Sequence, residues 1–158
     1  MAEPAITSFL GDYFFLSNFY RRAFFCEHPV FGRSFGLTSE HHFQAAKAYA
    51  RQDWLLVHAA SSPGEAKRRG RRIERNRNWD EVKIDIMRSI LQAKFADPIL
   101  RAKLLATGEA ELIEGNTWGD RFWGAVWIPL VDRDHWEGEN WLGKLLMEIR
   151  DGLRSSNG

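Results

Sequence analysis

A ten-residue stretch concentrates side chains suited to acid–base and nucleophilic chemistry. The segment TSEHHFQAAK, residues 38–47, holds a glutamate, two adjacent histidines, a glutamine and a lysine. At about 100° per helical residue, Glu40, Gln44 and Lys47 share a stripe that borders an apolar face. A carboxylate can move a proton and an amine can attack carbon, which makes this stripe a candidate catalytic site. The alternative is a surface ion pair between Glu40 and Lys47, worth under about 1 kcal/mol.

Positive charge gathers further along the chain. Seven of the eleven residues from 67 to 77 are Lys or Arg, and only Glu74 opposes them. Such a cluster attracts the phosphates of a substrate or of nucleic acid, although a charged helix face is often only solvated. The irregular segment NTWGDRFWGAVW, residues 116–127, adds Asp120, which either acts as an acid or shapes a turn.

The sequence does not indicate a metal site. His41 and His42 are adjacent, so on a helix they diverge by about 100° and cannot readily chelate one ion together. We expect one of them to pack against the fold and the other to meet solvent. Cys26 is the single cysteine, which excludes an intrachain disulfide and a cysteine-based zinc site. We therefore predict neither a metal nor a cofactor.

Helices dominate the segments that must position these residues. Helical periodicity and N-cap residues predict helices from Thr38 or Ser39 to about Val57, after Ser62, and over 79–95, 98–108 and 140–153. The first 37 residues have the aromatic and glycine pattern of short strands and turns, and 111–116 looks extended. The predicted fold class is mainly α with minor β.

Length and composition favour one domain. A chain of 158 residues with 44% hydrophobic residues suits a single core. We place this domain at residues 1–158, with an ordered core over about 7–154 and loose ends. No apolar run approaches the roughly 20 residues of a spanning helix, and the N-terminus lacks the regions of a signal peptide. We expect a cytoplasmic protein with no membrane partner.

Seven segments, in chain order, resemble the NADAR family, also called YbiA-like. They are FLSNFY at 15–20, TSEHHFQAAKA at 38–48, GEAKRRGRRI at 64–73, the tryptophan with IMRSILQAKF within 79–95, LLATGEAELIEGN at 104–116, DRFWG at 120–124 and GENWLGKLLMEIR at 138–150. The resemblance implies a compact, mainly helical domain that hydrolyses N-glycosidic bonds. Known family activities are removal of ADP-ribose from guanine in nucleic acid and cleavage of phosphoribosylated aminopyrimidine intermediates of riboflavin synthesis.

The resemblance implies catalytic roles for Glu40, Lys47 and Asp120. Glu40 and Lys47 match the family's EHxFQxxK motif, and Asp120 matches the acid that precedes WG. The doubled histidine departs from the commoner His–Tyr pair, so no role is carried over to His42. Substrate-binding roles follow from the resemblance together with the basic cluster for Asn18, Trp79, Arg68, Arg69, Arg72 and Trp123.

The reaction expected first is release of ADP-ribose from guanine in nucleic acid by an N-glycosidase. Glu40 and Asp120 can share proton donation, water activation and charge stabilisation, as carboxylates do in glycosidases. If the departing nitrogen is an exocyclic amine, Lys47 can capture the opened ribosylamine as a Schiff base. The alternatives are an N-glycosidase of a riboflavin-pathway ribosylamine phosphate and a non-catalytic module that binds ADP-ribose or a nucleotide. An ADP-ribosyltransferase toxin is the protein partner considered.

Overall fold

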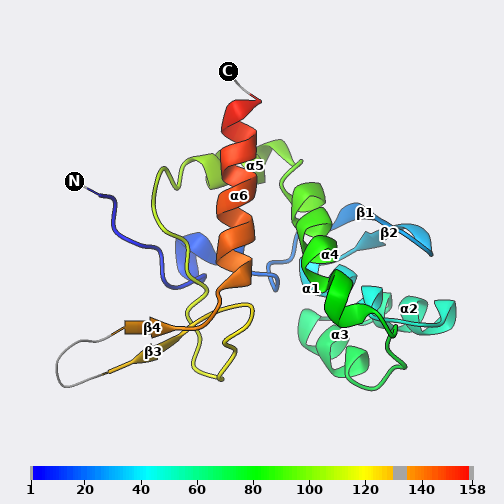
Figure 1. The fold of residues 1–158 in the computed structure, drawn as a ribbon. Coiled ribbons are helices and arrows are strands. Elements are labelled where there is room, and N and C mark those ends of the chain that lie inside the picture. Colours follow the sequence, from blue (N-terminus) through cyan, green and yellow to red (C-terminus); the bar gives the residue numbers. More distant parts are fainter. Residues whose placement is uncertain (1, 130–134, 157–158) are drawn as a thin grey trace. The chain divides into compact units, whose positions relative to one another are not determined.

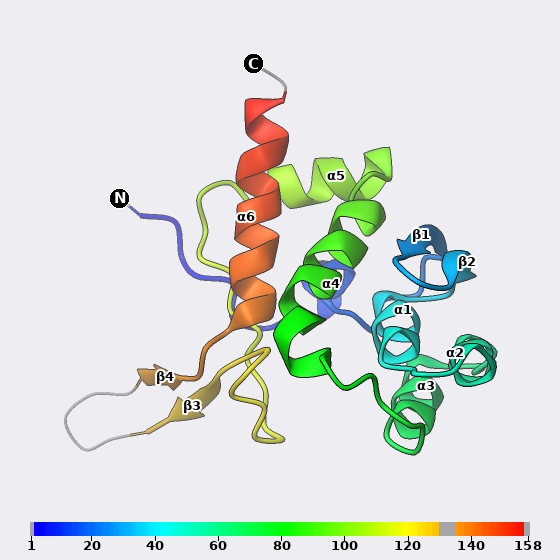
Figure 2. The ribbon, with the colours of Figure 1, turned by 45° about the vertical axis from the view of Figure 1, so that its right-hand side comes forward.

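The computed structural model describes residues 2–129 and 135–156, which are mainly helical with minor β structure, as predicted (Figures 1 and 2). The residues divide into two compact units. We call residues 18–97 the hairpin unit, and residues 1–17 with 98–158 the terminal unit. The single domain predicted from composition stays a prediction.

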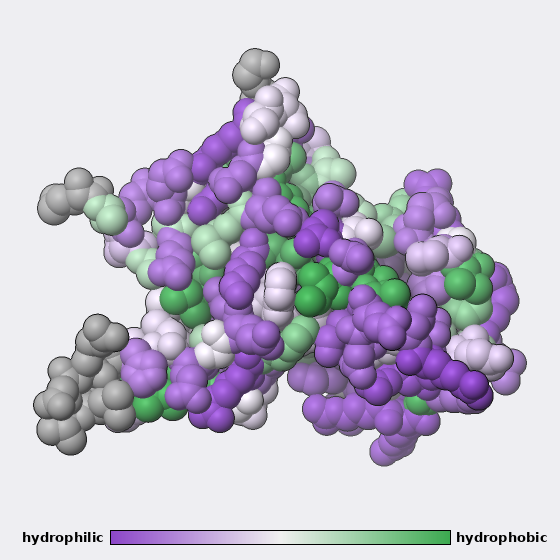
Figure 3. All heavy atoms as spheres, viewed as in Figure 1, coloured by the Kyte–Doolittle hydropathy of each residue, from purple (hydrophilic) through white to green (hydrophobic). Residues whose placement is uncertain are grey.

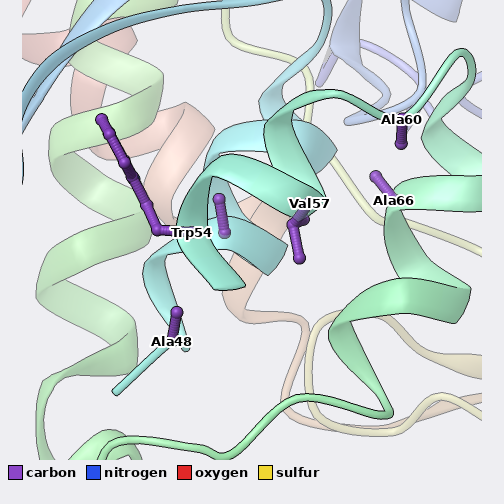
Figure 4. Close-up of a cluster of buried hydrophobic side chains, with 6 residues drawn as sticks. Ala48, Trp54, Val57, Ala60 and Ala66 are labelled. Carbon is purple, nitrogen blue, oxygen red and sulfur yellow. The ribbon is translucent and has the colours of Figure 1, made fainter. Parts of the chain in front are cut away.

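The hairpin unit holds one β-hairpin and four helices. Strands β1 (Phe24–His28) and β2 (Gly32–Gly36) pair antiparallel with Cys26 opposite Ser34. The helices are α1 (Ser39–Ala46), α2 (Arg51–His58), α3 (Pro63–Gly70) and α4 (Trp79–Lys94), and α4 contacts both α1 and β1. Small side chains let α1, α2 and α3 approach closely around a buried cluster, which Figure 4 shows. The cluster consists of Ala45, Ala48, Trp54, Val57, Ala60 and Ala66.

The helix predicted over 38–57 is two helices, because the backbone between them pairs elsewhere. Tyr49 N donates to Glu74 O at 3.0 Å, and Asn76 N donates to Lys47 O at 2.8 Å. Ala48 therefore forms an isolated antiparallel bridge with Arg75. These bonds use the Tyr49 N–H and the Lys47 carbonyl, which a continued helix would have paired within itself. Helix α1 therefore ends, and Lys47 is its C-cap.

The N-cap residues of α1, α3, α4 and the C-terminal helix α6 (Trp141–Ser155) are Thr38, Ser62, Asn78 and Asn140, and their side chains act differently. The Thr38 and Ser62 hydroxyls each accept a backbone N–H from the first turn of the helix that follows. Within the described residues, Asn78 and Asn140 make no such bond to their own helices. Asn140 has a φ of 53°, and its side-chain amide donates to the carbonyl of Leu112 instead.

The terminal unit contains the remaining elements: the 3₁₀ helix η1 (Gly11–Leu16), α5 (Pro98–Leu105), α6 (Trp141–Ser155) and the antiparallel strands β3 (Val126–Ile128) and β4 (His135–Glu137). The expectation of a loose end over residues 1–6 is wrong at Ile6, which is buried and bridges to Leu112. Of the C-terminal residues expected to be loose, 157 and 158 lie outside the described residues, as does residue 1. None of the described helices has the length and hydropathy to cross a membrane.

Candidate active site

Glu40 is a buried carboxylate held in the first turn of α1. Its side chain is 7% exposed, its backbone N–H donates to the carbonyl of Asn18 at 3.0 Å, and Gln44 Nε2 donates to its Oε1 at 2.7 Å. Asn18 is itself buried, with its amide nitrogen 3.7 Å from the sulfur of Met87. A carboxylate in such a place must be hydrogen-bonded to be tolerated. Gln44 thus holds the Glu40 carboxylate, and the Asn18 carbonyl holds the backbone that carries it.

Lys47 places an amine at the other end of α1. The side chain is half-buried, and Nζ lies 5.5 Å from the ring centroid of Phe43 and 6.0 Å from that of Trp79. Burial lowers the pKa of Lys47, and the charges of nearby arginines and a lysine lower it further, whereas Glu40 opposes them. A lowered pKa raises the fraction of neutral amine, which is the nucleophilic form.

Trp79 forms a buried wall next to this amine. The ring is 3% exposed and packs on Phe43, with 5.1 Å between centroids and 54° between planes. The indole is therefore packed against protein in this structure. The role of Trp79 in binding substrate stays a prediction.

The cations that act on Lys47 differ from those predicted to bind substrate. Lys67, Arg71 and Arg75 lower its pKa. Lys67 and Arg71 are four residues apart, so they share one side of the helical stretch. Their place beside Lys47 has no signal in the sequence, because it depends on the bridge between Ala48 and Arg75. The face in Figure 3 is hydrophilic over α3.

The three arginines that the sequence predicts to bind substrate have different surroundings. Arg68 and Arg72 are exposed and free to meet an anion from solvent. Arg69 already pairs with Glu65 at 2.6 Å and donates to the carbonyl of Leu56 at 2.7 Å. These bonds give Arg69 a structural role within α2 and α3.

Asp120 belongs to the terminal unit, where it organises a tight turn. Its Oδ1 accepts the backbone N–H groups of Phe122 at 3.0 Å and Trp123 at 2.9 Å. Asn116 brackets the same turn, because its side chain accepts from Asp120 N and donates to Asp120 O. The carboxylate and the Trp123 backbone are thus held together. The structure brings Asn18, Glu40, Lys47 and Trp79 together in the hairpin unit, and Asp120 with Trp123 in the terminal unit.

Both histidines of the motif are buried, so the expectation that one meets solvent is wrong. His41 Nε2 donates to the Ala60 carbonyl at 2.9 Å, and its Nδ1 is 2.8 Å from the Thr38 hydroxyl. His42 Nε2 donates to the Phe24 carbonyl at 3.0 Å, and burial lowers its pKa to about 4. Over residues 2–129 and 135–156, no group of three or more His, Cys, Asp or Glu side chains could hold a metal ion.

Comparison with known proteins gives concordant matches. Residues 8–154 match the family model of the NADAR domain. The N-glycosidase YbiA of Escherichia coli is 43% identical over 119 residues, which cover 73% of this chain and 69% of that protein. An N-glycosidase of Nostoc punctiforme is 40% identical over 126 residues, covering 75% of this chain and 74% of that protein.

A longer relative and a solved structure extend the likeness. A riboflavin biosynthesis protein of Vibrio vulnificus is 33% identical over 143 residues, covering 89% of this chain but only 35% of that protein. The NMR structure of E. coli YbiA superposes with a TM-score of 0.77 at 36% identity, covering 99% of this chain and 89% of that one.

Proposed function

Because the chain belongs to the NADAR family, we propose that it is an N-glycosidase that hydrolyses the bond between ADP-ribose and a guanine base in nucleic acid. The observation that carries the proposal is the half-buried Lys47, whose pKa is lowered, at the end of the helix that holds the buried Glu40. The names of two relatives supply the reaction class, since both are N-glycosidases.

The two side chains can cleave an N-glycoside of an exocyclic amine by a Schiff-base route. Such a ribosylamine opens its sugar ring to an imine at C1′. Lys47 Nζ attacks C1′, and the bond from C1′ to the base nitrogen breaks as Glu40 passes a proton from Nζ to that nitrogen. Water then adds to C1′ of the lysine imine, which releases the sugar as an aldehyde and restores the amine. The family motif assigns a catalytic role to a second carboxylate, Asp120, which would stabilise charge or activate water.

Charge around Lys47 supports a substrate that carries phosphates. Lys67, Arg71 and Arg75 are close enough to change the pKa of Lys47, and the exposed Arg68 and Arg72 extend the positive charge along the chain. A diphosphate beside a ribosylated base satisfies more of these cations than a single phosphate does. This count favours ADP-ribose.

A ribosylamine phosphate of riboflavin synthesis is the second candidate. One observation favours it, namely that the V. vulnificus relative is a riboflavin biosynthesis protein. The same lysine, carboxylates and cations can process it, because its reactive bond also joins an exocyclic nitrogen to C1′.

The deciding experiment offers the purified protein both substrates and follows base, sugar and nucleic acid by mass spectrometry. We expect free ADP-ribose and unmodified guanine in the nucleic acid, and a borohydride-trapped adduct on wild type that is absent from Lys47→Ala. Turnover of the riboflavin intermediate alone contradicts the ADP-ribose assignment and keeps the N-glycosidase. Retained binding of ADP-ribose without turnover of either substrate makes the protein a binding module.

A further inference from the structure

The hairpin unit contains a concavity apart from the candidate active site, which we call the hairpin pocket. It has a volume of about 330 Å³, and its walls come from β1 and β2, from α1 and α2, and from α4. Residues that define it are Ser34, His42, Trp54, His58, Val82 and Ile86. None of Glu40, Lys47 and Trp79 is among the residues that line it.

The pocket lies on another side of α1 from the candidate active site. His42 and Ala46 line it, and they follow Glu40 by two and six residues. At about 100° per residue these positions are some 200° and 240° around the helix from Glu40. The backbone links the two sites: Ala46 precedes Lys47, and Asn76, which also lines the pocket, donates its N–H to Lys47 O.

Burial favours the neutral forms of the imidazoles in the pocket wall. A carbonyl can only accept, so the bond to Phe24 O makes His42 Nε2 the donor, and in the neutral ring Nδ1 is then an acceptor. Ser34 Oγ lies 3.5 Å from that Nδ1 and 3.1 Å from His58 Nε2, so one hydroxyl joins the two rings. Burial lowers the pKa of His42 to about 4 and that of His58 to about 3. Near neutral pH these two side chains are therefore aromatic, polar and uncharged.

The charges of the remaining lining residues determine which ligand charges the pocket can bind. Among the described residues that form it, the formal charges belong to Glu27 and Asp85, both exposed, and no lysine or arginine takes part. Phosphate or carboxylate groups find no partner there, in contrast to the surroundings of Lys47. Asn76 and Asn78 supply neutral amides, which can both donate to and accept from the edge of a nitrogen heterocycle.

We propose that the hairpin pocket binds an uncharged one- or two-ring nitrogen heterocycle of the nucleobase class. Its volume is at the small end of the range for ligand pockets, about 300–1,000 Å³, which suits a base and not a dinucleotide. The rings of Trp54, His42 and His58 provide aromatic walls for a flat molecule, and Val82 with Ile86 provides apolar area. The proposal does not depend on the reaction at Lys47.

Binding of adenine tests the proposal, with the indole resonance of Trp54, assigned through Trp54→Phe, as the readout in NMR titrations. We expect adenine and hypoxanthine to shift this resonance, AMP to bind more weakly than adenosine because of its phosphate, and cyclohexanol to compete poorly. The variant Ile86→Phe fills the pocket from α4 and should weaken adenine binding by at least about tenfold. Ile84→Phe makes the same change on the same helix outside the lining and should leave binding unchanged.

Two further measurements test whether the pocket is independent of Lys47 and whether its ligand is a free base or a base within a strand. Lys47→Ala should keep full adenine binding even where it abolishes turnover. A short single-stranded DNA that displaces adenine identifies the ligand as a base within a strand, and failure to displace it identifies a free heterocycle. The proposal is overturned if neither base binds, if Ile86→Phe and Ile84→Phe bind adenine equally, or if cyclohexanol competes as well as adenine.

Discussion

At the scale of single residues, the two carboxylates can be changed to amides without removing the hydrogen bonds that hold them. Glu40 Oε1 accepts from Gln44, and Asp120 Oδ1 accepts from two backbone N–H groups, and an amide oxygen can accept the same bonds. We therefore expect Glu40→Gln and Asp120→Asn to lower turnover by at least about 100-fold. Steady-state kinetics and thermal melts measure both effects, and the melts should stay close to wild type. Turnover within a few-fold of wild type would contradict a catalytic role.

The lowered pKa of Lys47 predicts how activity depends on pH. Only the neutral amine attacks C1′, so the rate of adduct formation should rise with pH and level off below the 10.5 of an ordinary lysine. Glutamine at positions 67, 71 and 75 removes three charges that lower this pKa, so the rise should move to higher pH. Single-turnover trapping with borohydride across pH 6 to 10 measures the shift.

Matched substitutions separate this effect from general loss of positive charge. Arg68→Gln with Arg72→Gln removes two exposed charges that are not among the causes of the Lys47 pKa shift. This double variant should weaken substrate binding and its salt dependence while the pH profile stays in place. Equal movement of the profile in both sets of variants would argue against a local effect of Lys67, Arg71 and Arg75.

At the scale of elements, the contact between α3 and α1 positions the Glu40 carboxylate through Gln44. A Cβ added at Gly70 would lie 2.2 Å from Gln44 Oε1 and 3.0 Å from Gln44 Cβ. We expect Gly70→Ala to cost about 1–3 kcal/mol of unfolding free energy and to lower turnover, because Gln44 must shift away from Glu40. Denaturant unfolding and kinetics measure the two losses.

Gly64→Ala is the control within the same helix. A Cβ there meets only Arg68 Nη1, at 3.6 Å, which is ordinary contact. This variant should change neither turnover nor, beyond about 1 kcal/mol, stability. If both alanines behave alike, helix propensity and not the contact with Gln44 explains the result.

Local sequence patterns predicted where helices form better than where a helix is broken. N-cap positions, apolar periodicity and the glycine after α5 were sufficient for α3, α4, α5 and α6, because these features act within a few residues. The break after Ala46 was not predictable in this way. It depends on pairing between Ala48 and Arg75, which are far apart in the sequence.

The candidate site shows the same division between local and distant information. Helical spacing placed Glu40, Gln44 and Lys47 on one stripe, and the structure links Glu40 with Gln44 directly. Sequence could not show that Trp79 packs on Phe43, because that contact joins two helices. Nor could it show which cations surround Lys47, since that depends on the bridge at Arg75.

At the scale of the whole molecule, neutral histidines predict how stability depends on pH. The pKa of His42 falls from 6.5 to about 4 on folding, and that of His58 falls to about 3. A lowered histidine pKa means that stability is complete above pH 6.5 and is lost as pH falls from there toward the folded value. His42 alone accounts for about 3 kcal/mol by this linkage. Urea unfolding from pH 7.5 to 4.5 measures it.

His42→Gln tests whether His42 causes this change of unfolding free energy with pH. Glutamine can still donate a hydrogen bond to the Phe24 carbonyl but does not titrate in this range. The variant should be less stable than wild type at pH 7.5 and should lose less on acidification. An unchanged slope would assign the pH dependence to other groups.

The prediction that the reaction needs no metal or cofactor can be tested on the intact protein. In the proposed reaction Glu40, Lys47 and Asp120 supply acid, base and nucleophile, so we expect exhaustive chelation with EDTA to leave turnover unchanged. Activity that is lost on chelation and restored by one divalent ion would replace the Schiff-base route with metal-assisted hydrolysis.

The backbone bridge at Ala48 also affects how this sequence can diversify. Helices α2 and α3 form an excursion whose two ends are tied together beside Lys47, and the exposed Ala59 and Ser61 lie near its middle. Lengthening a surface loop adds little closure entropy when its ends are already fixed. Insertions between α2 and α3 can therefore accumulate in evolution, or be grafted by design, while the amine keeps its place.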